Sequence, residues 1–306
     1  MTAETPSPAS VAHASAHKLL SIRRIWAIAT NTFRDLVRQK VFYFMLVFAL
    51  ILIGTSLAMS AMTFKGQLET VMDVCLGAMS VFTMLLAVLS TAMLLPKDME
   101  DRTLYTILAK PVSRFEYLAG KLKGVTMILF VATLLMTAAF CIVLHFWQGR
   151  EIENILLTEP AERATAAIAA LKAGTFTPTL FGAIGVIFLR SIVCAALTLM
   201  LSCFATSWLF TVIVSMMMLL AGHLVPIARS AWQGPLGSSD VPLHLALLLR
   251  IITVFVPDMQ LFNVVDDIAG GVTVANEIFL RIAGLGVGYI VVYLLVGWLF
   301  FAWREL

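Results

Sequence analysis

Long uncharged apolar runs recur along the chain and set its architecture. A helix needs about 20 apolar residues, at 1.5 Å per residue, to cross a bilayer core of ~30 Å. The run from Thr177 to Ala228 is about twice that length, and the polar cluster Ser202, Thr206 and Ser207, closed by Trp208, predicts a tight turn that divides it. The pattern therefore predicts six spans, at about 41–62, 74–95, 125–147, 180–203, 208–228 and 282–303.

Composition agrees with a chain that has lipid as its outer solvent. Sixty per cent of the residues are hydrophobic and 13% are charged, against roughly a quarter charged in soluble domains. The first 20 residues have no apolar core of the kind a signal peptide needs, so we expect residues 1–20 to form a disordered cytoplasmic tail. We predict an all-α membrane protein, with residues 21–306 forming one transmembrane domain.

Two further elements are expected outside the spans. An Ala-rich helix is predicted to start at Pro160 and to end before Gly174. The apolar stretch 243–256 is too short for an ordinary crossing and contains Arg250, which favours a re-entrant or interfacial helix between spans five and six. If it crossed the membrane instead, the two termini would lie on opposite sides.

The distribution of basic residues predicts the orientation. With six spans, the side that holds both termini and the 96–124 loop carries 13 of the 21 Lys and Arg residues, and the other side carries seven. The positive-inside rule places the Lys- and Arg-rich loops in the cytoplasm. We therefore expect a multi-pass protein of the cell inner (plasma) membrane with both termini in the cytoplasm. Membrane lipid would surround its spans.

A basic amphipathic helix is predicted over residues 22–40. Apolar residues, among them Trp26 and Phe33, recur at helical spacing, while Arg34 and other polar residues occupy the opposite face. Such a helix lies in the membrane interface with its apolar face in the acyl boundary. It is either a general juxtamembrane anchor or an elbow helix that packs beside a cytoplasmic partner.

The loop between spans two and three has the features of a stiff protrusion. Asp98 can cap a helix that runs to about Ala109 and ends at Pro111. Ser113 can then start a second helix, since Glu116 three residues later completes a capping box. Two short helices joined by a rigid turn can transmit a push from a partner, which a flexible tether cannot.

This loop resembles the first intracellular loop of ABC-2 type transporter permeases, whose pattern is roughly E-x-x-x-T-L-x-x-L-L-x-x-P-V-S-R followed by G-K. The stretch 195–204, continuing to 221–223, and the ending 300–306 also resemble that family. The Asp101-Arg102 pair and the spacing between Glu100 and the Thr-Leu step depart from the pattern. The matching residues are Glu100, Thr103 or Thr106, Leu104, Leu108, Pro111, Val112, Ser113, Arg114, Gly120 and Lys121.

The resemblance implies the transmembrane subunit of an ATP-binding cassette exporter. Such a subunit would dimerise with a second permease chain, identical or different, and would dock ATP-binding subunits that hold the ATP and Mg. Nucleotide-driven closure of those subunits would push on the loop. By this resemblance, the residues that couple to the ATPase are Glu100, Arg102, Thr103, Pro111, Ser113 and Arg114.

The sequence lacks motifs for ATP binding and metal catalysis, as expected for a transmembrane subunit whose ATPase is on another chain. There is no P-loop and no H-E-x-x-H motif, and the four cysteines have neither metal-type nor disulfide-type spacing. We therefore expect no catalytic residue, no metal and no cofactor on this chain, and the small net charge of +3 does not point to nucleic acid. Gly284, Gly286 and Gly288 lie within an apolar helix and are interpreted as thinning one side for close packing.

Two polar residues inside the spans are gate or pathway candidates. Arg190 lies at mid-depth if its helix starts near Thr177, where a charge is usually functional. If the helix starts near Ile187, which is the alternative we favour from sequence, Arg190 reaches the outer interface. His223 lies near the outer end of the fifth span, either as a gate residue or as a packing residue.

Two other classes of function are weaker alternatives. An ion-coupled secondary transporter predicts intramembrane carboxylates and an inverted internal repeat, and neither is visible in the sequence. An integral membrane enzyme needs a polar catalytic set at consistent depth, which is also not visible.

Overall fold

A computed structural model of the chain describes residues 21–63, 66–100, 113–158, 160–205, 207–233, 256–263 and 276–303. Within these ranges the chain is helical with short connections, and they contain no strand. Six helices are long and apolar enough to cross a membrane, so the predicted all-α fold with six spans is confirmed. They are α3 (Lys40–Ala61), α4 (Gln67–Ala92), α7 (Arg114–Thr158), α9 (Pro178–Ser202), α10 (Trp208–Gln233) and α13 (Asn276–Trp303).

Four shorter elements complete the described structure. They are α2 (Ile22–Val37), α5 (Leu94–Glu100), α8 (Ala161–Thr175) and the 3-10 helix η1 (Met259–Phe262). Pro160 caps α8, which confirms the predicted Ala-rich helix, although α8 continues past Gly174 to Thr175. The predicted tail 1–20 and all of the predicted re-entrant helix 243–256 except Val256 lie outside the described residues.

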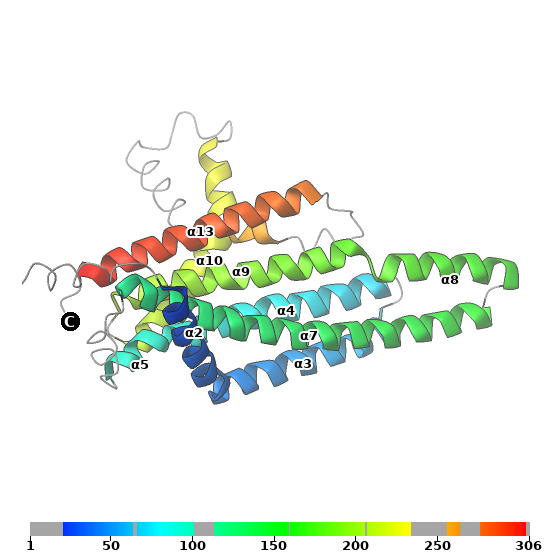
Figure 1. Cartoon of the computed structure of the whole chain (residues 1–306). Helices are drawn as coiled ribbons and strands as arrows, with labels where there is room; N and C mark the ends of the chain where they lie inside the picture. The colour runs from blue at the N-terminus through cyan, green and yellow to red at the C-terminus, as the bar shows by residue number, and fades with distance from the viewer. Residues whose placement is uncertain are drawn as a thin grey trace, which may run out of the picture.

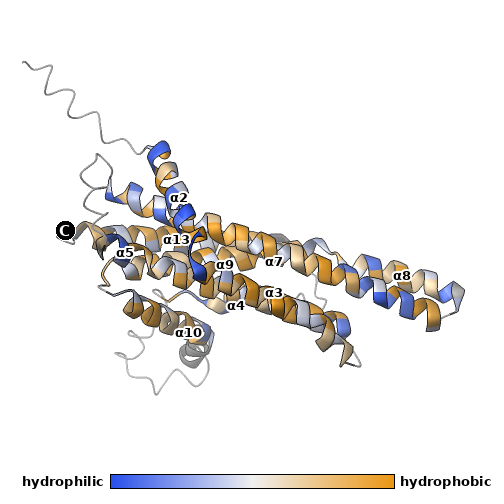
Figure 2. Cartoon of the chain, turned by 90° about the horizontal axis from the view of Figure 1, so that it is seen from below, coloured by the Kyte–Doolittle hydropathy of each residue, from blue (hydrophilic) through white to orange (hydrophobic). Residues whose placement is uncertain are grey.

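The spanning helices form a bundle with two different ends. In Figure 1, α3, α4, α7, α9 and α13 run side by side, α2 crosses one end, and the last turn of α13 lies at that same end. We call this the α2 end. At the opposite end, the α8 end, α7 extends beyond its neighbours and forms a hairpin with α8. Figure 2 shows hydrophobic residues along the bundle, with hydrophilic residues gathered on α2 and on the hairpin.

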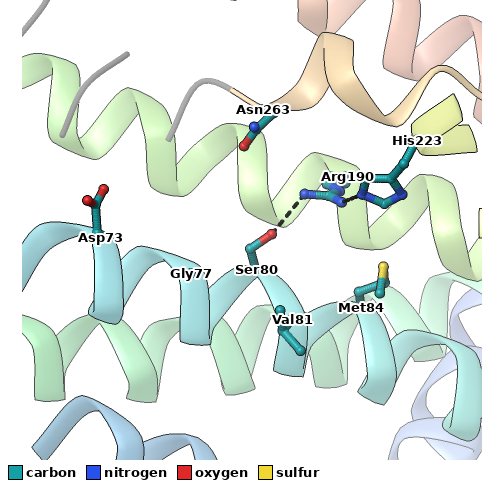
Figure 3. Close-up of a pocket in the computed structure, with 8 residues that line it drawn as sticks. All are labelled: Asp73, Gly77, Ser80, Val81, Met84, Arg190, His223 and Asn263. Atoms are coloured by element: carbon teal, nitrogen blue, oxygen red, sulfur yellow. Dashed lines mark hydrogen bonds between the residues drawn. The ribbon is translucent and has the colours of Figure 1, made fainter. Parts of the chain in front are cut away.

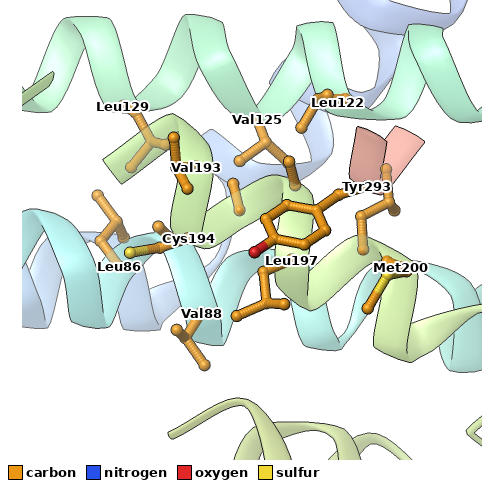
Figure 4. Packing of buried hydrophobic residues seen from close by; sticks show 14 of the residues in the cluster. Leu86, Val88, Leu122, Val125, Leu129, Val193, Cys194, Leu197, Met200 and Tyr293 are labelled. Atoms are coloured by element: carbon orange, nitrogen blue, oxygen red, sulfur yellow. The ribbon is translucent and has the colours of Figure 1, made fainter. Parts of the chain in front are cut away.

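The helix α9 is the centre of the core. It contacts α4, α7, α10 and α13, and 72% of its most apolar stretch is buried, against 28% for α10. Its side chains meet those of α4, α7 and α13 in the core shown in Figure 4. They include Leu86 and Val88 of α4, Leu122, Val125 and Leu129 of α7, Val193, Cys194, Leu197 and Met200 of α9, and Tyr293 of α13.

The outer surface of the bundle is strongly apolar. On α3, for example, Phe44 is 60% exposed and Val47 is 53% exposed. Soluble monomers rarely expose contiguous apolar faces of this extent. Lipid or another membrane chain must therefore cover them.

The amphipathic helix α2 packs closely on α7 through two glycines. A Cβ atom on Gly120 would lie 2.7 Å from the Cβ of Ile28, and one on Gly124 would lie 2.8 Å from the Ala29 carbonyl oxygen. The facing residues Ala29 and Thr32 are buried. Small residues four apart let two helices approach until their backbones touch, and this packing drives helix association in membranes.

A second close contact joins α13 to α9, and it corrects one sequence interpretation. A Cβ on Gly286 would lie 2.6 Å from a methyl carbon of Leu189, whereas one on Gly284 or Gly288 would meet nothing within 4 Å. Residues 284 and 288 are one turn apart, so they share a helix face, and residue 286 lies on the opposite face. Of these three glycines, only Gly286 packs closely against another part of the chain that the structure describes.

Replacing Gly124 with Ala tests the α2–α7 contact. We expect Gly124→Ala to lower the free energy of unfolding by about 1–3 kcal/mol, as overpacking does in well-packed interiors, and to lower the thermal midpoint in mild detergent. Gly149→Ala is the matched control, because it lies in the same helix with nothing within 4 Å of its Cβ position. Alanine there should be neutral or slightly stabilising. Equal midpoints for the two variants would contradict the contact.

Candidate functional site

The predicted coupling loop is described only at its two flanks. Arg102, Thr103 and Pro111 lie outside the described residues, as does the side chain of Glu100, whose backbone ends α5. The structure therefore leaves their role as predicted. What it does show is how the start of α7, which carries Ser113 and Arg114, is anchored.

The capping box at the start of α7 is present as predicted. The backbone N–H of Glu116 donates to Ser113 Oγ at 3.1 Å, and the backbone N–H of Ser113 donates to Glu116 Oε2 at 2.9 Å. These reciprocal bonds satisfy two backbone donors that a helix start otherwise leaves without partners. The helix α7 is thus firmly fixed at the point where the loop enters it.

The carboxylate of Glu116 also holds the start of α2. Its Oε1 accepts a hydrogen bond from the backbone N–H of Ser21 at 2.6 Å, and Ser21 is the N-cap residue of α2. Arg24, on the first turn of α2, lies 3.7 Å from Oε2. Glu116 is only 1% exposed, so these bonds satisfy a charge that would be unfavourable to bury alone. One side chain therefore ties two helix starts together.

Asp98 does not cap a helix, which corrects the sequence prediction. The helix α5 begins at Leu94, so Asp98 lies inside it. Its carboxylate instead pairs with Lys121 on α7, with Nζ and Oδ2 2.6 Å apart, and it accepts a hydrogen bond from the hydroxyl of Tyr117. Lys121 is nearly buried. This ion pair fixes the last described turn before the loop to the first turns after it.

Arg114 joins the start of α7 to the end of α13. Its Nη1 donates to the carbonyl oxygens of Phe301 at 2.6 Å and Ala302 at 2.9 Å, and its guanidinium lies over the Phe301 ring. Carbonyls in the last turn of a helix have no partner within the helix and carry partial negative charge, which favours a cation there. Tyr117 stacks on the same ring, with the centroids 5.9 Å apart. Arg114 therefore has an intramolecular role that the sequence did not suggest.

The elbow residues lie on different sides of α2. Trp26 is 54% exposed and Lys123 of α7 lies 5.8 Å from its ring centroid. Phe33 is partly buried against the core, and Arg34 is exposed. The predicted apolar face is thus shared between α7 and the outside, and its placement in the membrane interface stays a prediction.

The second cluster lies halfway along the bundle, and it overturns the interpretation of Arg190 that we favoured. The helix α9 begins at Pro178, not near Ile187, so Arg190 is at its midpoint and is only 8% exposed. Its guanidinium bonds to Ser80 Oγ of α4 and to His223 Nε2 of α10, each at 2.9 Å. The sequence identified Arg190 and His223 separately, but Ser80 stands in an apolar run with no signal to distinguish it.

These residues line a cavity of about 290 Å³ between α4, α9, α10 and the segment that carries η1. Figure 3 shows Arg190 between Ser80 and His223, with Asn263 above and Asp73 further along α4. Among the described residues, no group of three His, Cys, Asp or Glu side chains is placed to hold a metal ion.

The segment 256–263 closes one side of this cluster. A Cβ on Gly222 would lie 2.6 Å from the Pro257 carbonyl oxygen, and Gln260 Nε2 donates to the His223 carbonyl oxygen at 3.3 Å. Met259 and Phe262 are fully buried. Backbone that is not α-helical is tolerated at membrane depth where protein surrounds it or where it lines a cavity. Here residues 256–259 and Phe262 are buried, and Asn263 lines the cavity.

Comparison with known families identifies the chain. The family described as ABC-2 family transporter protein matches residues 26–306, which is nearly the whole chain. A search of curated proteins finds no match. The chain belongs to the ABC-2 transporter family and is a multi-pass membrane protein, with the membrane domain of an ABC transporter permease subunit.

Replacing Arg114 with Gln tests its capping of α13. We expect backbone amides in the last turn of α13 to exchange hydrogen about tenfold faster, because a hydrogen bond to a charged group contributes about 1.5 kcal/mol and tenfold corresponds to 1.4 kcal/mol. Hydrogen–deuterium exchange followed by mass spectrometry in mild detergent measures the exchange rate of these amides directly. Arg281→Gln, on an exposed residue at the other end of α13, is the control. The same exchange in both variants would exclude the capping role.

Proposed function

We propose that this ABC-2 family member is the permease subunit of an ATP-driven exporter whose ATPase is a separate polypeptide. The sequence contains no P-loop, so ATP and Mg would be bound and hydrolysed on that partner. The functional unit would be a dimer of two permease chains, identical or different, with two ATPase subunits. It would lie in the cell inner membrane with the α2 end in the cytoplasm.

The observation that carries this proposal is the anchoring of both flanks of the 101–112 loop. Before the loop, Asp98 pairs with Lys121; after it, Ser113 and Glu116 cap α7. A force on the loop therefore reaches α7 directly rather than being absorbed by loose connections. From α7 it passes to α2 through Glu116 and to α13 through Arg114. Such an arrangement suits a loop that an ATPase pushes.

The loop lies on the side that the charge pattern assigns to the cytoplasm. The α2 end holds α2, the two described flanks of the 101–112 loop and the end of α13. With six spans, the sequence segments on this side are 1–40, 96–124 and the last three residues, and they carry 13 of the 21 Lys and Arg residues. The positive-inside rule then favours a cytoplasmic α2 end, where a partner that binds ATP would dock. The hairpin of α7 and α8 would lie on the opposite side.

Reversing the charge of Arg102 tests ATPase docking. We expect Arg102→Glu to lower at least about tenfold the amount of P-loop ATPase that co-purifies with the tagged chain from its native membrane, because charge reversal at a docking contact leaves like charges facing each other. The measurement is mass spectrometry of the purified complex together with its vanadate-sensitive ATPase activity.

The matched control for this variant is Arg163→Glu. Arg163 is an exposed arginine on α8 at the opposite end of the bundle, so the same charge reversal there should leave the ATPase bound. If Arg163→Glu released the ATPase and Arg102→Glu did not, the docking side would be the α8 end. No ATPase with the unmodified chain would contradict the proposal as a whole.

Reporter fusions test the orientation independently of any partner. A reporter fused after Leu306 should be active only as a cytoplasmic reporter, and one inserted between α7 and α8 should read from the outside. These outcomes follow from an even number of spans and the positive-inside rule. An outside signal from the Leu306 fusion, with the hairpin also outside, would mean that an additional segment crosses the membrane.

A further inference from the structure

The cavity beside Arg190 is not needed to explain how an ATPase would move the bundle. It lies at the midpoint of α9, whereas the anchored loop flanks lie at the α2 end. A buried cation in a membrane protein is unfavourable unless it is paired or functional. The composition of this cavity therefore points to what it binds.

Among the residues that the structure describes, the positive charge of Arg190 has no acidic partner. Its two partners, Ser80 and His223, are uncharged hydrogen-bond acceptors in this arrangement. Two ion pairs among the described residues, Arg24 with Glu116 and Lys121 with Asp98, both lie at the α2 end and not beside Arg190. Arg190 is only 8% exposed. No described carboxylate lies within ion-pair distance to neutralise its charge.

The hydrogen bonds position the guanidinium without using all of its donors. His223 Nδ1 lies 2.9 Å from the Leu219 carbonyl oxygen, which can only accept, so Nδ1 carries the proton and Nε2 accepts from Arg190. Ser80 accepts from the other terminal nitrogen. A guanidinium has five N–H donors, and Nε of Arg190 is buried with no hydrogen-bond partner among the described residues. Donor capacity therefore remains for an anionic ligand.

The walls of the cavity are mixed in character. Val81 and Met84 supply apolar surface beside the polar residues, and Val81 is 49% exposed at the outer surface of the chain. The volume of about 290 Å³ is near the lower limit of small-molecule sites, which suits a head group rather than a whole lipid. Asp73 lies two helical turns, about 10 Å, from Ser80 on α4. Its carboxylate disfavours a ligand with negative charge at both ends.

We propose that this cavity binds the anionic head group of an amphiphile, with a phosphate or carboxylate paired to Arg190 and the apolar chain along Val81 and Met84. A bidentate guanidinium–oxyanion pair is short and directional, and Ser80 and His223 hold the guanidinium in place for it. The proposal rests on the proposed transport function and names the class of substrate. It is specific to an anion carried on an apolar chain, as opposed to a free anion.

Direct binding of radiolabelled dodecyl phosphate to the full chain tests the proposal. The chain is reconstituted in nanodiscs of zwitterionic lipid, so that partitioning of the probe into lipid is the same for every variant. We expect Arg190→Gln to weaken binding at least about tenfold, and Arg190→Lys to retain part of the affinity because the charge remains. Arg281→Gln, which changes an arginine away from the cavity, should bind like the unmodified chain. Equal binding by Arg190→Gln and the unmodified chain would overturn the proposal.

Competition on the unmodified chain gives an answer even if an Arg190 variant does not fold. Unlabelled dodecyl phosphate should displace the probe, whereas dodecyltrimethylammonium should not. Displacement by the cationic amphiphile at similar concentration would overturn the charge assignment. Displacement by inorganic phosphate at the concentration at which dodecyl phosphate acts would overturn the amphiphile assignment, because the site would then bind a free anion.

This assay requires no ATPase, so its failure is distinct from failure of the proposed function. If an ATPase co-purifies with the chain but the chain does not bind dodecyl phosphate, the permease proposal stands and the proposed class of substrate is wrong. If the chain binds dodecyl phosphate through Arg190 but no ATPase co-purifies with it, the head-group site stands and the proposal of ATP-driven export is wrong.

Discussion

Helix ends that must find hydrogen-bond partners determine how the α2 end is built. Every α-helix leaves N–H groups at its start and carbonyl groups at its end without partners inside the helix. Here Glu116 accepts from the backbone N–H groups of Ser21 and Ser113, and Arg114 donates to the carbonyl of Phe301. Two side chains on the first turn of α7 therefore bind the first and the last described helices of the chain.

The first turns of α7 carry two distinct contact faces, and helical spacing explains both. Glu116, Gly120 and Gly124 are four residues apart, so they lie in one row, and this row faces α2. Tyr117 and Lys121 form a neighbouring row that faces α5 and α13. Lipid supplies no hydrophobic drive for helices to associate, so close packing and polar contacts must do so. Both are concentrated where the predicted coupling loop enters the bundle.

The distance along the sequence between interacting groups decided what could be predicted. The Ser113–Glu116 capping box spans three residues and was predicted, as were the six spans, because both depend on local spacing. The contact of Arg114 with α13 joins residues 187 apart and uses backbone carbonyls, which have no distinguishing residue type. The span predicted at about 180–203 lies close to α9, but the start near Ile187 that we favoured for Arg190 was a misplacement, although Pro178 gave a local signal, since Pro is favoured at the first helical position. That misplacement put Arg190 at the outer membrane interface instead of at the centre of the bundle.

The cavity beside Arg190 has one wall that is less firmly held than the others. The helix α9 is packed on several sides, whereas α10 buries only 28% of its most apolar stretch and supplies His223. On the described residues, the contacts that join α10 to the cluster include the His223–Arg190 bond, the hydrogen bond from Gln260 to the His223 carbonyl oxygen and the close contact of Gly222 with Pro257. Separating α10 from α9 therefore breaks fewer contacts than separating α4 from α9. A change transmitted from the α2 end through the tightly packed α7 and α9 would therefore separate α10 from α9 more readily than α4 from α9, because less of α10 is buried and fewer contacts hold it.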